Sequence, residues 1–280
     1  MIQKKAPGPL AARLKSTTLG ELGARLPIGV PNPMDGSLQK DMSAMAWKTK
    51  HERAIGQLRS DNMNFAQYAT LVISQLFTRI GPHEFTAETK QAEKQLKIGQ
   101  MYMPDILYMY IWLRTQVISP ILEMNMVCGV SNCRDKFRFK GDLNSLEVHT
   151  LDKLADMDWY YTLQDPITIR NTVIKKFRVN ITKWYQLETS IVQGFNDSTA
   201  KIAIARSSVV GFNDDPELTQ LMDSEMDEIS KRDLESLTSK IDQDFIGPKM
   251  TLEGACPKCN VSFNSAVNWR DNDFFSESSR

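Results

Sequence analysis

The sequence lacks the features that would send the chain to a membrane, out of the cell or onto nucleic acid. No apolar run approaches the roughly 18 residues that a membrane-spanning helix needs. The basic N-terminus "MIQKKAPGPLAARLKSTT" has no apolar core of about 7 to 15 residues, so we expect no secretory signal. The 34 Lys and Arg balance the 34 Asp and Glu, so the chain has no net positive charge to attract it to the phosphates of nucleic acid.

Signatures of catalysis are absent as well. The chain has no GxxxxGK[ST] or GxGxxG phosphate loop, no GxSxG elbow and no HExxH helix. Asp214 and Asp215 precede a proline and are typical of solvated turn residues. The three histidines, His51, His83 and His149, lie in polar stretches, and we expect them on the surface. The sequence therefore predicts that the chain is not an enzyme.

What is present predicts a globular α+β protein. Hydrophobic residues make up 41% and charged residues 24% of the 280 residues, enough for one large domain or two ordinary ones. Helical spacing prevails before residue 122, and β-branched alternation follows it, including "DPITIRNTVIKKFRVNIT" and "AKIAIARSS". We predict five regions: an extended basic arm (1–37), a helical domain (38–121), a β-rich region (122–214), an acidic helix (215–247) and a C-terminal tail (248–280).

Within the helical domain we expect three main helices, and a short polar helix in "TAETKQAEKQLKIG" between the second and the third. One spans about 38–58, and a second is capped by Asp61 and stopped by Gly81. The third begins at Pro104, and we expect it to be buried because "DILYMYIWLRTQVI" is apolar nearly all round.

Charge is unevenly spread along the chain. Residues 1–60 carry ten Lys and Arg against four acids, a net +6, and residues 211–245 carry three Lys and Arg against eleven acids, a net −8. Two interpretations remain open. Either both segments are surfaces that bind partners, or the first is a basic tail and the second is an ordinary solvated helix.

The four cysteines form two tight pairs far apart in sequence. Cys128 and Cys133 close "CGVSNC", and Cys256 and Cys259 close "CPKC". A thiolate pair on one turn holds half of a tetrahedral Zn²⁺ shell, so two such knuckles complete a structural site with no open position for water. The 122 intervening residues would be an insertion whose ends meet, and loop-closure cost grows only slowly with length. Unpaired or redox thiols, disulfides, another metal, or His149 replacing one thiol remain alternatives.

The order of these parts resembles the baseplate hub and assembly protein family of T4-type contractile-tailed bacteriophages. The resemblance is carried by "RLPIG", by "DILYMYIWLRTQ" from Asp105 through Arg114, by the first cysteine pair with "GDLNSLEV", and by the late pair leading to "DFF". It covers residues 22–148 and 250–276, about half of the chain. The segment from about 150 to 245 has no counterpart, and "RLPIG" is a loose version of the family stretch.

The resemblance implies a structural component of the virion, located in the tail baseplate and made in the host cytoplasm. It implies that Cys128, Cys133, Cys256 and Cys259 bind zinc. The partners would be other baseplate or tail proteins, docked by Leu26 and Pro27 of the arm and by Phe274 and Phe275 of the tail, with no small-molecule substrate. Two alternatives remain: an assembly factor that leaves before the particle matures, and a zinc-ribbon nucleic-acid binder using Trp47, Phe65 and Tyr68, which the balanced charge disfavours.

Overall fold

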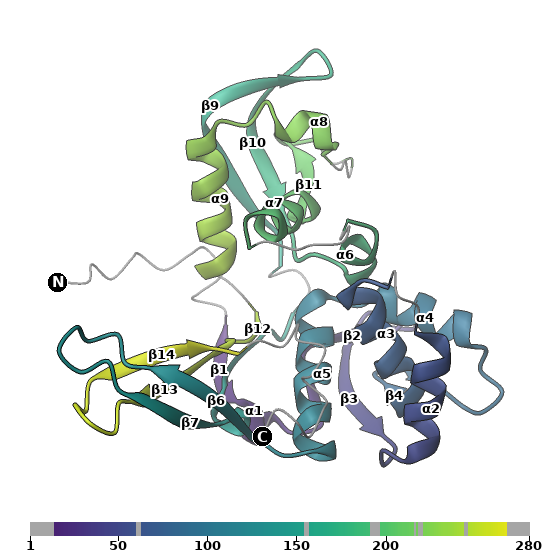
Figure 1. Cartoon of the computed structure of the whole chain (residues 1–280). Helices are drawn as coiled ribbons and strands as arrows, with labels where there is room; N and C mark the ends of the chain where they lie inside the picture. Colours follow the sequence, from purple (N-terminus) through teal and green to yellow (C-terminus); the bar gives the residue numbers. More distant parts are fainter. Residues whose placement is uncertain are drawn as a thin grey trace.

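The computed structural model describes residues 14–59, 63–153, 157–190, 197–215, 217, 221–243 and 246–267. The fold class is α+β as predicted, and every strand pair that it describes is antiparallel. No helix in these ranges is long and apolar enough to cross a membrane. Figure 1 shows three parts: a helical body, an inserted module and a pair of projecting β-hairpins.

The helical body packs helices against a four-stranded sheet of order β2-β3-β4-β5. The strands are β2 (Arg25–Pro31), β3 (Leu38–Ala44), β4 (Phe77–Ile80) and β5 (His83–Glu84). The helices are α2 (Thr49–Leu58), α3 (Phe65–Leu76), α4 (Gln91–Gly99), α5 (Met103–Val117) and α6 (Trp184–Ser190).

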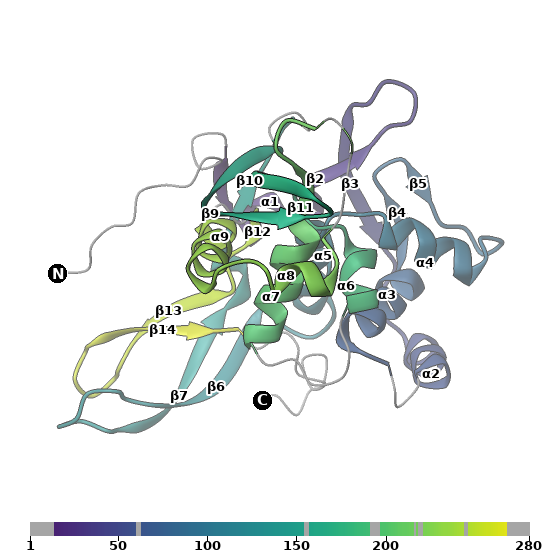
Figure 2. The same cartoon turned by 90° about the horizontal axis from the view of Figure 1, so that it is seen from above.

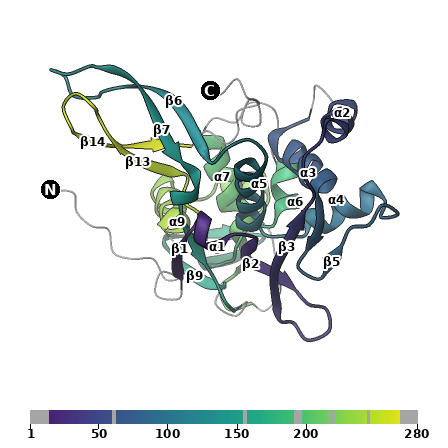
Figure 3. The same cartoon turned by 90° about the horizontal axis from the view of Figure 1, so that it is seen from below.

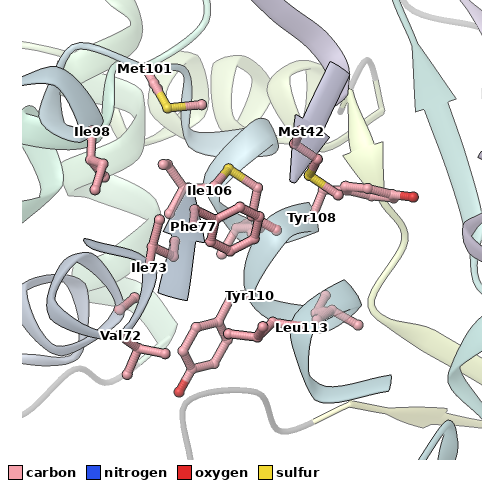
Figure 4. Packing of buried hydrophobic residues seen from close by; sticks show 14 of the residues in the cluster. Met42, Val72, Ile73, Phe77, Ile98, Met101, Ile106, Tyr108, Tyr110 and Leu113 are labelled. Atoms are coloured by element: carbon pink, nitrogen blue, oxygen red, sulfur yellow. The ribbon is translucent and has the colours of Figure 1, made fainter. Parts of the chain in front are cut away.

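Helix α5 is the centre of this body. Pro104 occupies its first turn, where a missing N–H costs nothing, and almost every following side chain is buried, as the apolar sequence predicted. Figure 4 shows Ile106, Tyr110 and Leu113 of α5 among residues from β3, α3, β4 and α4.

A second sheet, of order β1-β8-β12, joins the body to the other two parts. It contains β1 (Lys15–Thr18), β8 (Glu147–Thr150) and β12 (Gly247–Pro248), and the short helices α1 (Leu19–Leu22) and Leu143–Ser145 lie beside it. His149 of β8 pairs with Gly247 of β12, so the chain returns to the place that it left about a hundred residues earlier.

Apart from α6, which packs in the helical body, most of the described intervening residues form the inserted module, which has a hydrophobic cluster of its own. A sheet of order β11-β10-β9 packs against helices (Figure 1). Its elements are β9 (Trp159–Ile169), β10 (Thr172–Val179), α7 (Asp197–Ser208), β11 (Val209–Phe212), α8 (Asp223–Met226) and α9 (Lys231–Gln243).

The two projecting hairpins leave the β1-β8-β12 sheet on either side of that insertion. One consists of β6 (Ile121–Val127) and β7 (Lys136–Asp142), the other of β13 (Thr251–Ala255) and β14 (Ser262–Ala266). We call them together the double ribbon. Figures 1, 2 and 3 all show the ribbons side by side and extending away from the helical body.

Several predicted boundaries are wrong. Most of the described part of the basic arm is built into the fold, because β1 pairs with β8, β2 pairs with β3, and Leu19 and Ile28 are fully buried. The helical domain opens with strand β3 rather than a helix, because the "PNPMDGS" turn folds 38–44 back onto β2. Gly81 does not end the second helix as expected. Helix α3 already ends at Leu76, and strand β4 separates it from Gly81.

The β-rich region and the acidic helix also need correction. "AKIAIARSS" belongs to helix α7, and its Ala205 packs into the hydrophobic cluster of the inserted module. In its described residues the acidic segment forms two helices, α8 and α9, and Ser230 starts α9 by accepting a hydrogen bond from the Asp233 N–H at 3.2 Å. Asp233 is itself fully buried, and its carboxylate accepts from Tyr161, Gln164 and Asp165. Asp61, the expected cap of α3, lies outside the described residues, and Asn64 caps that helix.

Candidate metal centre

The four cysteines meet at the far ends of the two ribbons. Cys128 and Cys133 lie in the turn between β6 and β7, and Cys256 and Cys259 lie in the turn between β13 and β14. The Sγ atoms of Cys128 and Cys259 are 3.6 Å apart, those of Cys133 and Cys256 are 3.8 Å apart, and all four lie within 4.8 Å of one another. The prediction that the two distant knuckles form one cluster is confirmed.

These separations fit a metal–thiolate site better than a disulfide. A tetrahedron with zinc–sulfur bonds of about 2.3 Å places its sulfurs about 3.8 Å apart, whereas bonded sulfurs are only about 2.05 Å apart. All four thiols are free in the structure, and Cys128 and Cys256 are buried. Four soft sulfur donors in this arrangement suit a tetrahedral metal ion.

Each knuckle is a turn that a backbone hydrogen bond closes. The Cys128 N–H donates to the Asp135 carbonyl at 2.9 Å, and the Cys256 N–H donates to the Val261 carbonyl at 3.0 Å. The residue after the second cysteine takes a left-handed conformation in both turns, with φ of 43° at Arg134 and 58° at Asn260. Asparagine tolerates this region well, so "CPKCN" is a favourable sequence for the turn.

The pKa values of Cys256 and Cys128 shift in opposite directions within the cluster. Backbone N–H groups, that of Cys259 foremost, lower the pKa of Cys256 to about 7. At Cys128 the Val130 N–H acts in the same direction, but burial and hydrogen bonds from the other thiols outweigh it and raise the pKa to about 12. Four thiolates so close together repel one another, so full ionisation needs a bound metal ion to compensate their charge.

Aromatic side chains hold the ribbons face to face behind the cysteines. The ring of Phe263 on β14 lies 5.1 Å from that of Phe139 and 5.6 Å from that of Phe137, both on β7. A Cβ on Gly254 would meet Phe139 at 2.6 Å and Phe263 at 2.7 Å, so glycine is needed for this close approach. The sequence reasoning missed these contacts, although the alternation in "KFRFK" could have indicated an inward-facing pair of phenylalanines.

No histidine belongs to the cluster. Within the described part of the chain, the four cysteines are the group that could hold a metal ion. His149 instead approaches the Glu147 carboxylate through Nε2 at 3.0 Å, on strand β8. The expectation of surface histidines is wrong for His51, which is buried and accepts a hydrogen bond from the Lys48 N–H through Nδ1.

The predicted partner contacts of the arm are corrected. Leu26 is fully buried and Pro27 is buried, because β2 lies between β3 and helix α5. Neither side chain offers a surface to another protein. Phe274 and Phe275 of the tail lie outside the described residues.

One buried site of a different kind was not predicted. Asp105 on α5 is fully buried, and its two carboxylate oxygens accept hydrogen bonds from the N–H groups of Ile28 at 2.8 Å and Gly29 at 3.0 Å. Burial raises the pKa of Asp105 to about 7, although these two donors and the charge of Lys40 act to lower it. No signal in the sequence distinguishes this aspartate from an ordinary acidic residue in a first helical turn.

Comparisons with protein-family models, with curated proteins and with solved structures found no match to this chain.

Proposed function

We propose that the four cysteines bind one structural Zn²⁺ ion that fastens the two ribbons together. The observation that carries this proposal is the separation of 3.6 to 3.8 Å between sulfurs of opposite knuckles. Four thiolates fill a tetrahedral shell, whereas catalytic zinc sites keep one position for water or substrate. The ion would thus act on folding and rigidity, not on a substrate, and the role that we propose for the chain is structural.

We further propose that the chain is a structural component of the baseplate of a contractile phage tail, in its hub region. The support for this assignment is the sequence resemblance, together with the way in which its separate stretches contact one another. Asp105 of the "DILYMYIWLRTQ" stretch binds Ile28 and Gly29 of "RLPIG". The carbonyl of Leu146 in "GDLNSLEV" accepts from the Leu19 N–H at 2.9 Å, and the Leu19 carbonyl accepts from the Tyr108 hydroxyl at 3.2 Å. Three of the stretches that carry the resemblance, "RLPIG", "DILYMYIWLRTQ" and "GDLNSLEV", are therefore linked by these hydrogen bonds.

The architecture suits a joint between neighbouring proteins. The double ribbon extends away from the helical body in all three views of the whole chain (Figures 1, 2 and 3). An isolated two-stranded ribbon is only marginally stable in water. A metal ion at the outer end and the phenylalanine stack behind it would make this projection rigid enough to hold a partner in a fixed position.

Composition of the particle tests the assignment. Phage particles and tail precursors purified from infected cells are analysed by mass spectrometry for peptides of this chain. We expect the chain in mature particles at a fixed ratio to the other baseplate proteins. Presence in tail precursors with absence from the particle would instead identify an assembly factor, and absence from both would reject the baseplate assignment.

A further inference from the structure

The outer face of the β6–β7 ribbon carries a row of cations. Side chains alternate along β7, so Phe137 and Phe139 point toward the other ribbon while Lys136, Arg138 and Lys140 are exposed on the opposite face. We call these three residues the basic row. Arg134 extends it at the metal end, where it is also exposed.

Acidic groups of the chain neutralise only part of this row. Glu123 of β6 binds Arg138 at 3.1 Å and Lys140 at 3.0 Å. Among the described residues, no carboxylate lies within ion-pair distance of Lys136 or Arg134. Among the described residues, the three cations of the basic row therefore face a single paired carboxylate.

The metal end of the ribbon also carries an exposed aliphatic side chain and a shallow depression. Val127 is 60% exposed beside Lys136, its direct partner across the two strands. A depression lies over these positions and is lined by Asn125, Met126, Val127, Lys136, Phe137 and Arg138. Val127 and this depression therefore adjoin the cations of the basic row.

We propose that the basic row, with Val127, binds an acidic extended segment of a partner protein. Cations at every second residue of a strand repeat at about 6.6 to 6.8 Å, and carboxylates at every second residue of an extended partner segment repeat at the same interval. Aliphatic side chains of that segment would cover Val127. This inference rests on the proposed function as a structural joint and names the chemistry of the neighbour.

The face is less suited to nucleic acid. Binding of single strands relies on aromatic side chains that stack on bases, and the aromatic residues of this ribbon, Phe137 and Phe139, are turned inward. A peptide that alternates acidic and aliphatic residues can instead pair with Lys136 and cover Val127.

Direct binding to the purified zinc-loaded chain tests the proposal. The probe is a fluorescent decapeptide that alternates glutamate and valine, followed by polarisation at low salt. Comparison probes are the same peptide with glutamine in place of glutamate, and a single-stranded 20-nucleotide thymidine oligomer. We expect saturable binding of the acidic peptide alone, weakened at least about tenfold by the double variant Lys136→Glu, Arg138→Glu.

The matched control reverses two exposed cations elsewhere, Lys231→Glu with Arg232→Glu on α9 of the inserted module. It changes the net charge equally and should alter peptide affinity by less than about twofold. Failure of the acidic peptide to bind, equal losses in both double variants, or tighter binding of the oligonucleotide would overturn the proposal. Because the assay uses the isolated chain, these outcomes are independent of whether the chain is found in phage particles.

Discussion

The carboxylate of Asp105 on helix α5 accepts a hydrogen bond from the backbone N–H of Gly29, 76 residues earlier in the sequence, at 3.0 Å. Gly29 has φ of 99°, and a Cβ at this position would lie 2.8 Å from the Gln39 carbonyl oxygen. The glycine thus lets β2 pass close to β3, and the aspartate satisfies the two N–H groups that this path leaves without a strand partner. The contact holds the central helix and the first sheet of the body together.

Replacing Asp105 with asparagine should destabilise the chain by about 1 to 3 kcal/mol, because the amide NH₂ would face one of two buried N–H donors. Urea unfolding followed by circular dichroism measures this loss. Asp41→Asn is the control, since that side chain is 73% exposed and its ion pair with Arg25 is long, at 3.9 Å. Equal stability of the two variants would show that the Asp105 contact contributes little.

The same carboxyl makes stability depend on pH. Its folded pKa of about 7 lies above the usual value, so the folded state holds the proton more tightly than the unfolded chain does. Its contribution is complete below about pH 4 and is lost as pH rises through 7. The stability advantage of the natural chain over Asp105→Asn should therefore shrink from pH 5 to pH 8, by up to about 1.4 kcal/mol per pH unit. Urea midpoints of both chains over this range test the sign, and an advantage that grows with pH would contradict it.

Close packing of the ribbons can be tested with one methyl group. Gly254→Ala places a Cβ within 2.7 Å of two phenylalanine rings, which must move apart, and we expect a loss of about 1 to 3 kcal/mol in ribbon stability. Hydrogen exchange of the β13 and β14 amides measures it. Gly129→Ala in the first knuckle is the matched control, because nothing lies within 4 Å of its added Cβ. Comparable exchange rates in the two variants would argue against the face-to-face stack.

The metal site predicts a clear difference between two neighbours in the second knuckle. Cys256→Ser removes a ligand, so we expect loss of bound metal, rapid exchange in both ribbons and a melting temperature lower by several degrees. Lys258→Ser changes an exposed residue between the cysteines and should keep the metal and the melting temperature. Metal retention by the Cys256 variant would remove that residue from the ligand set.

How much of this could be predicted from sequence depends on how local the signal is. Pro104 and the apolar run after it predict α5, and cysteine pairs spaced three and five residues apart predict the two knuckles. Each of these patterns depends on residues within one or two turns of one another. The wrong predictions concern segments whose structure is decided by distant partners. Residues 38–44 are a strand because β2 and β4 flank them, and "AKIAIARSS" is a helix because Ala205 packs in the inserted module.

The candidate site shows the same division. The cysteine spacing predicts the ligands, but the contact that brings the knuckles together lies elsewhere, in the pairing of His149 with Gly247. Leu26 and Pro27 were expected to meet a partner because prolines and basic residues surround them. They are buried because β2 lies between β3 and α5, which no local pattern around residue 26 reveals.

Metal content of the purified chain, measured by elemental analysis with a thiol titration on the same sample, tests the central claim most directly. We predict about one zinc per chain and four thiols that react only after chelation or unfolding. A chain without metal whose four thiols all react freely in the folded state would contradict a zinc ion that fastens the two ribbons together.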